Sequence, residues 1–194
     1  MLREASAYFA GKGRLHDTLH RLTERLDSEE ISYALLGGLA LGEYGYPRLT
    51  EDIGLLLTPA GLERFRSNLL GRGYGPAFTD AEKTFRDTDS GVRIEIVTTG
   101  EYPGDGLPKP VAFPDPATPG VAIEVDGIRV IALEQLIELK LASGISAPHR
   151  LRDLADGQDL IVRRRLDLAL AERLDPYVRG AYEDLWQRAH GGVK

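Results

Sequence analysis

Two neighbouring apolar segments constrain most strongly how this chain can fold. The first ends in two glycines, and the second begins with a carboxylate. Residues 31–38, ISYALLGG, predict a buried strand that ends at a glycine pair. Residues 39–45 predict a short helix, and residues 52–58, DIGLLLT, predict a second buried strand. Glycine lets the backbone approach a ligand closely, and a helix N-terminus offers free N–H groups, so such a turn suits phosphate. An ordinary strand-to-helix turn is the alternative.

Asp52 brings a charge to the start of the second apolar strand. A carboxylate in this place loses hydration unless a cation or hydrogen bonds satisfy it. Arg48 and Thr50 lead into the same edge, and Gly54 shares the strand face of Asp52 because side chains alternate along a strand. Asp52 therefore either belongs to a ligand site, or it caps a turn or pairs with Arg48.

The rest of the chain predicts an α+β fold, in which a mixed β-sheet is flanked by helices and followed by a C-terminal helical part. Helical periodicity, strand alternation and a loop rich in proline and glycine give the further elements. These are helices at 14–27 and 59–71, hairpins at 83–99 and 121–133, the loop at 100–120, and helices from 133 onward. We divide the chain into an N-terminal helical segment (1–30), a core (31–132) and a C-terminal helical region packed on the core (133–194).

Composition excludes several kinds of site. The 194 residues include no cysteine, so disulfides, thiolate zinc sites and a cysteine nucleophile are excluded. The net charge of −6 does not support attraction to nucleic acid over the whole surface. No segment resembles a secretory signal or a membrane span, so we expect a cytoplasmic protein without a membrane partner. His16 and His20 are four residues apart, which fits either a metal pair or a solvated helix face.

The segment GGLALGEYGYPRLTEDIGLLL resembles the signature of the DNA polymerase beta-type nucleotidyltransferases. It is most similar to the small bacterial branch that includes toxins of abortive-infection systems. In that signature a glycine pair and a short helix precede an Arg-x-Thr-x-Asp-hydrophobic-Asp segment that opens a strand. The resemblance implies a nucleotidyltransferase core in which phosphates and metal meet at five positions: Gly37, Gly38, Arg48, Thr50 and Asp52.

Two later segments extend the resemblance. The family takes a further metal carboxylate from a later strand, and Glu95 in VRIEIV is the candidate; a solvent-facing Arg–Glu surface is the alternative. The family also has a lysine on an apolar helix followed by a basic-Asp pair. Lys140 matches the lysine, since it falls within the apolar stripe of its helix. Arg152, Asp153 and Asp156 follow it as supporting residues, and an ion pair between helices explains them equally well.

Gly54 departs from the family pattern, because it stands where the second metal carboxylate is expected. Mg²⁺ in a two-metal site bridges phosphate oxygens to hard carboxylates. With glycine at position 54, only Asp52 and Glu95 remain as candidate metal ligands. We therefore expect Mg²⁺ or Mn²⁺ to be bound weakly or singly, and the reaction to be slow.

The resemblance implies an enzyme that transfers a nucleoside monophosphate from a nucleoside triphosphate to an acceptor. On this interpretation Asp52, Glu95 and Lys140 are catalytic, and the glycine pair with Arg48 and Thr50 binds the nucleotide. The family's acceptors include proteins, tRNA and small molecules. The alternative is a non-catalytic protein or interaction module, such as one half of a toxin–antitoxin or phage-defence pair with an antitoxin partner.

Overall fold

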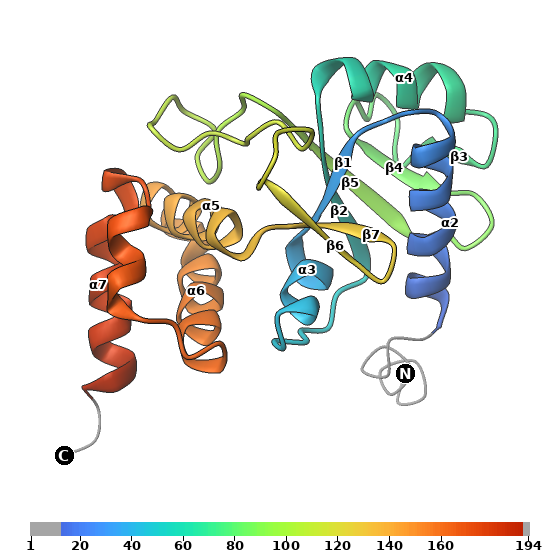
Figure 1. Ribbon diagram of the computed structural model, residues 1–194. Helices are drawn as coiled ribbons and strands as arrows, with labels where there is room; N and C mark the ends of the chain where they lie inside the picture. The colour runs from blue at the N-terminus through green and yellow to red at the C-terminus, as the bar shows by residue number, and fades with distance from the viewer. Residues whose placement is uncertain (1–12, 192–194) are drawn as a thin grey trace.

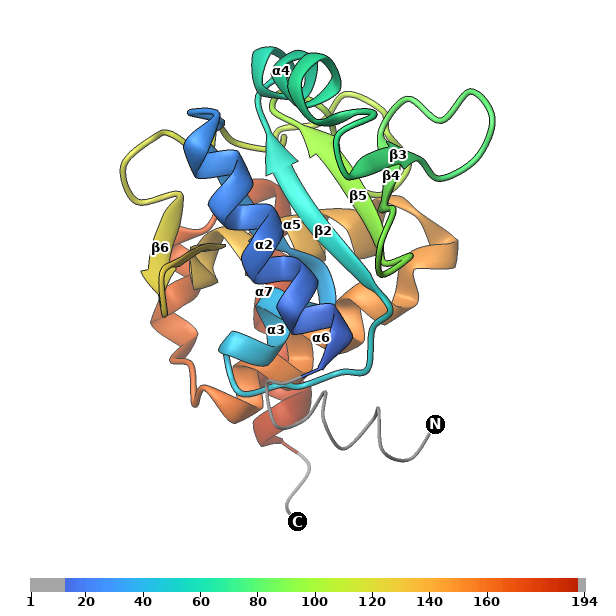
Figure 2. The same ribbon diagram turned by 90° about the vertical axis from the view of Figure 1, so that its right-hand side faces the viewer.

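The computed structural model describes residues 13–191, which form one mixed β-sheet between two groups of helices. Helices α2 and α4 lie on one side of the sheet, and α5, α6 and α7 lie on the other (Figures 1 and 2). The described helices are α2 (Arg14–Ser28), α3 (Gly37–Glu43), α4 (Pro59–Leu69), α5 (Leu133–Ser146), α6 (Leu151–Arg163) and α7 (Pro176–His190), with short 3-10 helices η1 (Pro148–Arg150) and η2 (Leu168–Arg173).

The described strands form a seven-stranded sheet in the order β3-β4-β5-β2-β1-β7-β6. Their bounds are β1 (Tyr33–Leu36), β2 (Asp52–Leu57), β3 (Tyr74–Pro76), β4 (Thr84–Asp87), β5 (Arg93–Thr98), β6 (Ala122–Val125) and β7 (Ile128–Ile131). Strand β2 is antiparallel to β1 and parallel to β5, and β7 is parallel to β1. The beginning of β2 therefore lies beside the end of β1, where α3 starts.

Helix α4 shows how local sequence fixes an element. Thr58 precedes it, and its hydroxyl oxygen accepts a hydrogen bond of 2.9 Å from the Gly61 amide. Pro59 occupies the first turn, where its missing N–H costs nothing. The buried face of the helix carries Leu62, Phe65 and Leu69 onto the sheet. Polar capping thus sets the start, and apolar burial holds the helix in place.

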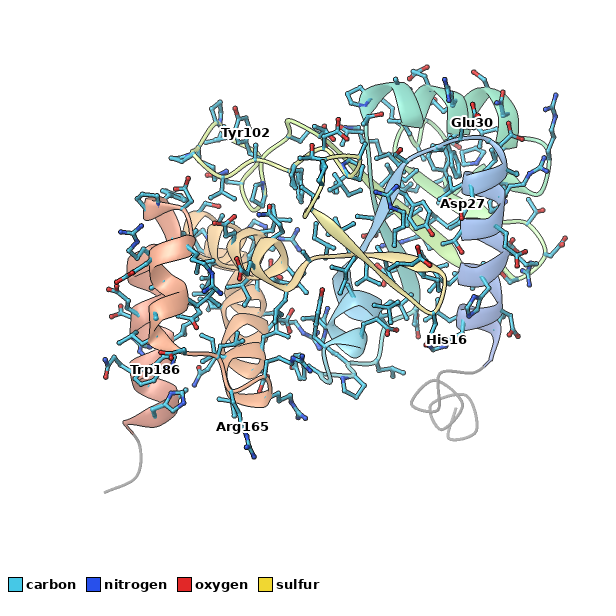
Figure 3. The ribbon with its side chains drawn as sticks, in the orientation of Figure 1. His16, Asp27, Glu30, Tyr102, Arg165 and Trp186 are labelled. Atoms are coloured by element: carbon cyan, nitrogen blue, oxygen red, sulfur yellow. The ribbon has the colours of Figure 1, made fainter. Side chains whose placement is uncertain are left out.

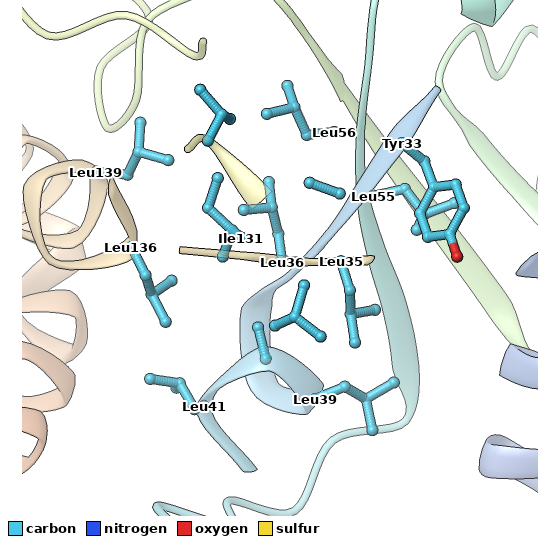
Figure 4. Packing of buried hydrophobic residues seen from close by; sticks show 14 of the residues in the cluster. Tyr33, Leu35, Leu36, Leu39, Leu41, Leu55, Leu56, Ile131, Leu136 and Leu139 are labelled. Carbon is cyan, nitrogen blue, oxygen red and sulfur yellow. The ribbon is translucent and has the colours of Figure 1, made fainter. Parts of the chain in front are cut away.

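Apolar side chains from both sides of the sheet belong to one core. On the C-terminal side, Leu36 of β1 and Ile131 of β7 meet Leu136 and Leu139 of α5 (Figure 4). On the other side, Phe65 packs against Phe85 with ring centroids 4.8 Å apart. The C-terminal helices therefore share the core of the sheet.

The expected α+β fold, with its mixed sheet, flanking helices and C-terminal helical part, is confirmed. Strand β3 is absent from the prediction, because its three residues include a glycine and a proline and carry no alternating pattern. The predicted helix at 59–71 ends at Leu69 and leaves room for this short edge strand. Among residues 13–191, no helix has the length and apolar character needed to cross a membrane.

Truncation of Phe65 tests the core. Phe65 is fully buried between Tyr74 and Phe85, so we expect Phe65→Ala to lower the free energy of unfolding by about 3–5 kcal/mol. Phe78→Ala is the matched control, because Phe78 is 60% exposed and should lose less than about 0.5 kcal/mol. Urea unfolding of both variants measures the difference, and equal losses would contradict this description of the core.

Candidate functional site

The glycine pair lies at the end of β1 and opens α3. Gly37 has a φ of 70°, a left-handed conformation that favours glycine, and a Cβ there would meet nothing within 4 Å. Gly38 is needed for another reason: a Cβ at this position would lie 2.8 Å from the Thr50 Cβ. Thr50 can thus pack against the turn only because residue 38 has no side chain.

Thr50 connects the glycine turn to Asp52. Its hydroxyl donates a short hydrogen bond to Oδ1 of Asp52, the first residue of β2. Both residues are partly exposed, so the carboxylate lies at the sheet edge within reach of solvent. Three predicted site residues, Gly38, Thr50 and Asp52, therefore form one continuous contact.

The strand register brings Glu95 to the same place. In the parallel pairing of β2 with β5, Asp52 stands opposite Arg93, and Gly54 stands opposite Glu95. Gly54 is also opposite Leu36, the residue before the glycine pair. Paired residues project from the same face of a sheet, so Asp52, Gly54, Arg93 and Glu95 share one face. The predicted carboxylates thus come from adjacent strands beside the glycine turn.

The donor set does not fit a two-metal site. Asp52 accepts from Thr50, position 54 offers no carboxylate, and Glu95 forms an ion pair with Arg93. Among residues 13–191, no group of three or more His, Cys, Asp or Glu could hold a metal ion. His16 lies on α2, across the sheet from α5 and α6 (Figure 3). Single, weak binding of Mg²⁺ at Asp52 and Glu95 stays a prediction, and it requires Glu95 to separate from Arg93.

Lys140 occupies a buried network between α5 and α6. Its Nζ lies 2.6 Å from Oδ1 of Asp153 and 2.7 Å from Oδ2 of Asp156. The Ser143 hydroxyl donates to the other Asp153 oxygen at 2.6 Å. The Lys140 side chain is only 12% exposed and that of Asp156 only 1%. The Lys140 ammonium group is therefore bound by two carboxylates.

Charges around Asp153 keep it ionised. Burial by itself raises the pKa of Asp153, but the Lys140 ammonium and the hydrogen bonds from Lys140 and Ser143 outweigh it. The pKa of this carboxyl consequently lies below its ordinary value. Arg150 adds a weaker ion pair, with Nε 3.7 Å from Asp153 Oδ2. Arg152, predicted as a supporting residue, is exposed, and the arginine that pairs with Asp153 is Arg150.

The same network reaches the loop before β2. Nε of Arg48 lies 3.9 Å from Oδ1 of Asp156. Farther along α6, the guanidinium of Arg163 lies 5.2 Å from the centre of the Tyr46 ring and donates to the Gly45 carbonyl at 3.5 Å. Helix α6 thereby holds the loop that carries Arg48 and Thr50. The sequence pattern missed Tyr46, Ser143 and Arg163, because each acts on a residue distant along the chain.

A cavity of about 490 Å³ lies elsewhere on the described surface. Its lining includes Val111 of the loop before β6, Glu138 of α5, and Arg173 and Arg179 near the start of α7. It contains none of the predicted site residues. The glycine turn and the Asp52 face therefore form a separate candidate site.

Substitution of Gly38 tests the close approach to Thr50. Thr50 is β-branched and bonded to Asp52, so it cannot move freely from a new Cβ. We expect Gly38→Ala to lower the free energy of unfolding by about 1–3 kcal/mol. Gly42→Ala, in the same helix with open space around it, should instead raise that free energy by up to about 1 kcal/mol. Chemical denaturation distinguishes them, and equal effects would refute the role assigned to Gly38.

Removal of Lys140 tests the buried network. Lys140→Met leaves Asp153 and Asp156 without their cation, so we expect a loss of about 3–5 kcal/mol at pH 7. Because the pKa of Asp153 is lowered in the folded protein, its contribution exists above the ordinary value of 3.8 and disappears as the pH falls through the folded value. The difference between wild type and variant should consequently shrink in acid.

The control for this variant is Lys83→Met, which removes a more exposed ion pair with Glu101. We expect it to cost less than about 1 kcal/mol. Unfolding curves taken from pH 7 down to well below 3.8 measure both variants. A Lys140→Met loss that stays constant as the pH falls below 3.8 would argue against carboxylate charge as its cause.

Comparison with solved structures shows which known proteins share this fold. No protein-family model matches the chain, and no curated protein matches its sequence. The structure of ANT(2'')-Ia in complex with adenylyl-2''-tobramycin aligns with a TM-score of 0.56 and 13% identity, covering 87% of this chain and 96% of that one. An antigenic nucleotidyltransferase-like protein from Paracoccidioides brasiliensis aligns with a TM-score of 0.51 and 16% identity, covering 86% of this chain and 84% of that one. The chain therefore has the fold of these nucleotidyltransferase structures, which confirms the fold that the sequence resemblance implied.

Proposed function

We propose that this protein binds a nucleoside triphosphate at the glycine turn and transfers its nucleoside monophosphate slowly to an acceptor. The observation that carries the proposal is the register of β2, in which Asp52 and Glu95 share a sheet face beside Gly37 and Gly38. The nucleotidyltransferase fold of the chain supports it. In this proposal the acceptor oxygen attacks the α-phosphorus, its proton is released, and pyrophosphate leaves.

The residues of the chain have distinct proposed roles. Gly37 leaves open space for phosphate oxygens, and Thr50 orients the Asp52 carboxylate. Lys140 acts as a positioning residue, because its ammonium holds Asp156, which in turn lies beside Arg48. The proposed slow rate follows from Gly54, because the centre of this face has no carboxylate at the position where the family has one.

A non-catalytic role is the second candidate, and the ion pair between Arg93 and Glu95 favours it together with Gly54. Under that hypothesis the protein keeps the fold but acts as an interaction module, for instance in a toxin–antitoxin or phage-defence pair. The two candidates differ in one respect that can be measured, which is turnover by the wild-type chain.

Restoration of the missing carboxylate tests the proposed function. A Cβ at position 54 would lie 3.4 Å from the Leu36 carbonyl oxygen, an ordinary contact, so the site has room for a side chain. We expect Gly54→Asp to increase transfer of labelled nucleoside monophosphate about tenfold or more, since each 1.4 kcal/mol off the barrier is a factor of ten. Gly54→Asn is the control, because it has nearly the same shape without the charge.

The assay offers three acceptor classes: the chain itself as a protein, bulk tRNA, and tobramycin, the compound named with ANT(2'')-Ia. Asp52→Ala should abolish transfer in every active sample. Equal activity of Gly54→Asp and Gly54→Asn would contradict the assigned role of position 54. Binding of triphosphate without any transfer by wild type or Gly54→Asp would favour the non-catalytic candidate.

A further inference from the structure

Two rows of paired residues cross the sheet face that carries Asp52. The first row runs Gly75, Arg86, Arg93 and Asp52 over β3, β4, β5 and β2. The second row runs Thr84, Glu95, Gly54 and Leu36 over β4, β5, β2 and β1. Side chains in each row project from the same face, so Arg93 lies beside Asp52 and Arg86 lies one strand farther from it.

Arg86 and Arg93 stand directly opposite one another in the antiparallel pair β4–β5. Directly opposed residues have Cβ atoms about 5 Å apart, and like charges in such a pair are unfavourable. Arg93 forms an ion pair with Glu95, in which the arginine side chain is 56% exposed. Within residues 13–191, Arg86 has no hydrogen bond or ion pair to another side chain, and it is exposed. Of the two arginines, only Arg93 is in an ion pair, so the Arg86 guanidinium can accept an anion as a partner.

The surroundings leave this charge accessible. Gly75 flanks Arg86 in the row, and a Cβ there would meet only the Thr88 methyl group at 3.9 Å. Gly54 flanks Glu95 in the next row and likewise contributes no side chain. Guanidinium groups bind phosphate oxygens through paired, charge-assisted hydrogen bonds. An anion shared by both arginines would also relieve their mutual repulsion.

We propose that Arg86 and Arg93 bind the phosphoryl groups of the nucleotide directly, so that binding does not require a divalent cation. This inference rests on the proposed function for the identity of the ligand, while the anion site itself rests on the strand register. The positive charge that metal ions bring to phosphate in a carboxylate-rich site comes here from two side chains. The same chemistry accepts free tripolyphosphate, which lacks the nucleoside.

Calorimetric titration tests the proposal with ATP and with tripolyphosphate, each in EDTA and in Mg²⁺. We expect both ligands to bind in EDTA. Arg86→Gln and Arg93→Gln should each weaken binding about tenfold or more, because each removes a hydrogen bond between charged groups. Arg72→Gln is the matched control, since Arg72 is an exposed arginine that donates only to the Asn68 carbonyl. Asp52→Asn should strengthen binding in EDTA, because it removes a neighbouring negative charge.

The outcomes separate this inference from the proposed function. If tripolyphosphate binds in EDTA but ATP does not, and both arginine variants lose this binding, the result supports the anion site and excludes the nucleotide as its ligand. Binding of ATP that requires Mg²⁺ and is unchanged in both variants overturns the inference and leaves the proposed function intact. Absence of binding by either ligand under all conditions overturns both. Circular dichroism of each variant checks that the fold is retained.

Discussion

The pairing register of β2 with its two neighbours is the constraint on which the candidate site depends. It places Gly54 between Leu36 and Glu95, and Asp52 beside Arg93. A slip of one residue would turn Asp52 into the core and expose Ile53, which is fully buried. Burial of Ile53, Leu55 and Leu57 on the opposite face therefore fixes where every polar group of the site lies.

A buried network of charges joins the C-terminal helices to this edge. Asp156 contacts both Lys140 of α5 and Arg48 of the loop before β2. A buried charge is costly unless partners satisfy it, so these residues specify one arrangement of helix and loop. The network explains how a helical region distant in sequence positions Arg48 and Thr50. It also explains why Lys140 lies within an apolar stripe, where its ammonium reaches two carboxylates.

Local patterns predicted much of the fold. The glycine pair, the two hairpins and the amphipathic helix α2 could be identified because each is encoded within a few consecutive residues. Strand β3 could not be predicted, since it is held only by its pairing with β4. Among the candidate site residues, the sequence pattern predicted Asp52, Thr50 and Glu95, whereas Arg86 is proposed only from the strand register. Two arginines seven residues apart give no local signal, and only the turn between β4 and β5 places them opposite each other.

Protection of backbone amides against hydrogen exchange on addition of ATP tests the central claim most directly, because it locates the bound phosphates. The account predicts protection at the glycine turn (36–39), at the start of β2 (50–54) and on β5 (93–95). Protection confined to the cavity of about 490 Å³ formed by residues 110–112 and 172–176 with Glu138 and Arg179 would contradict it.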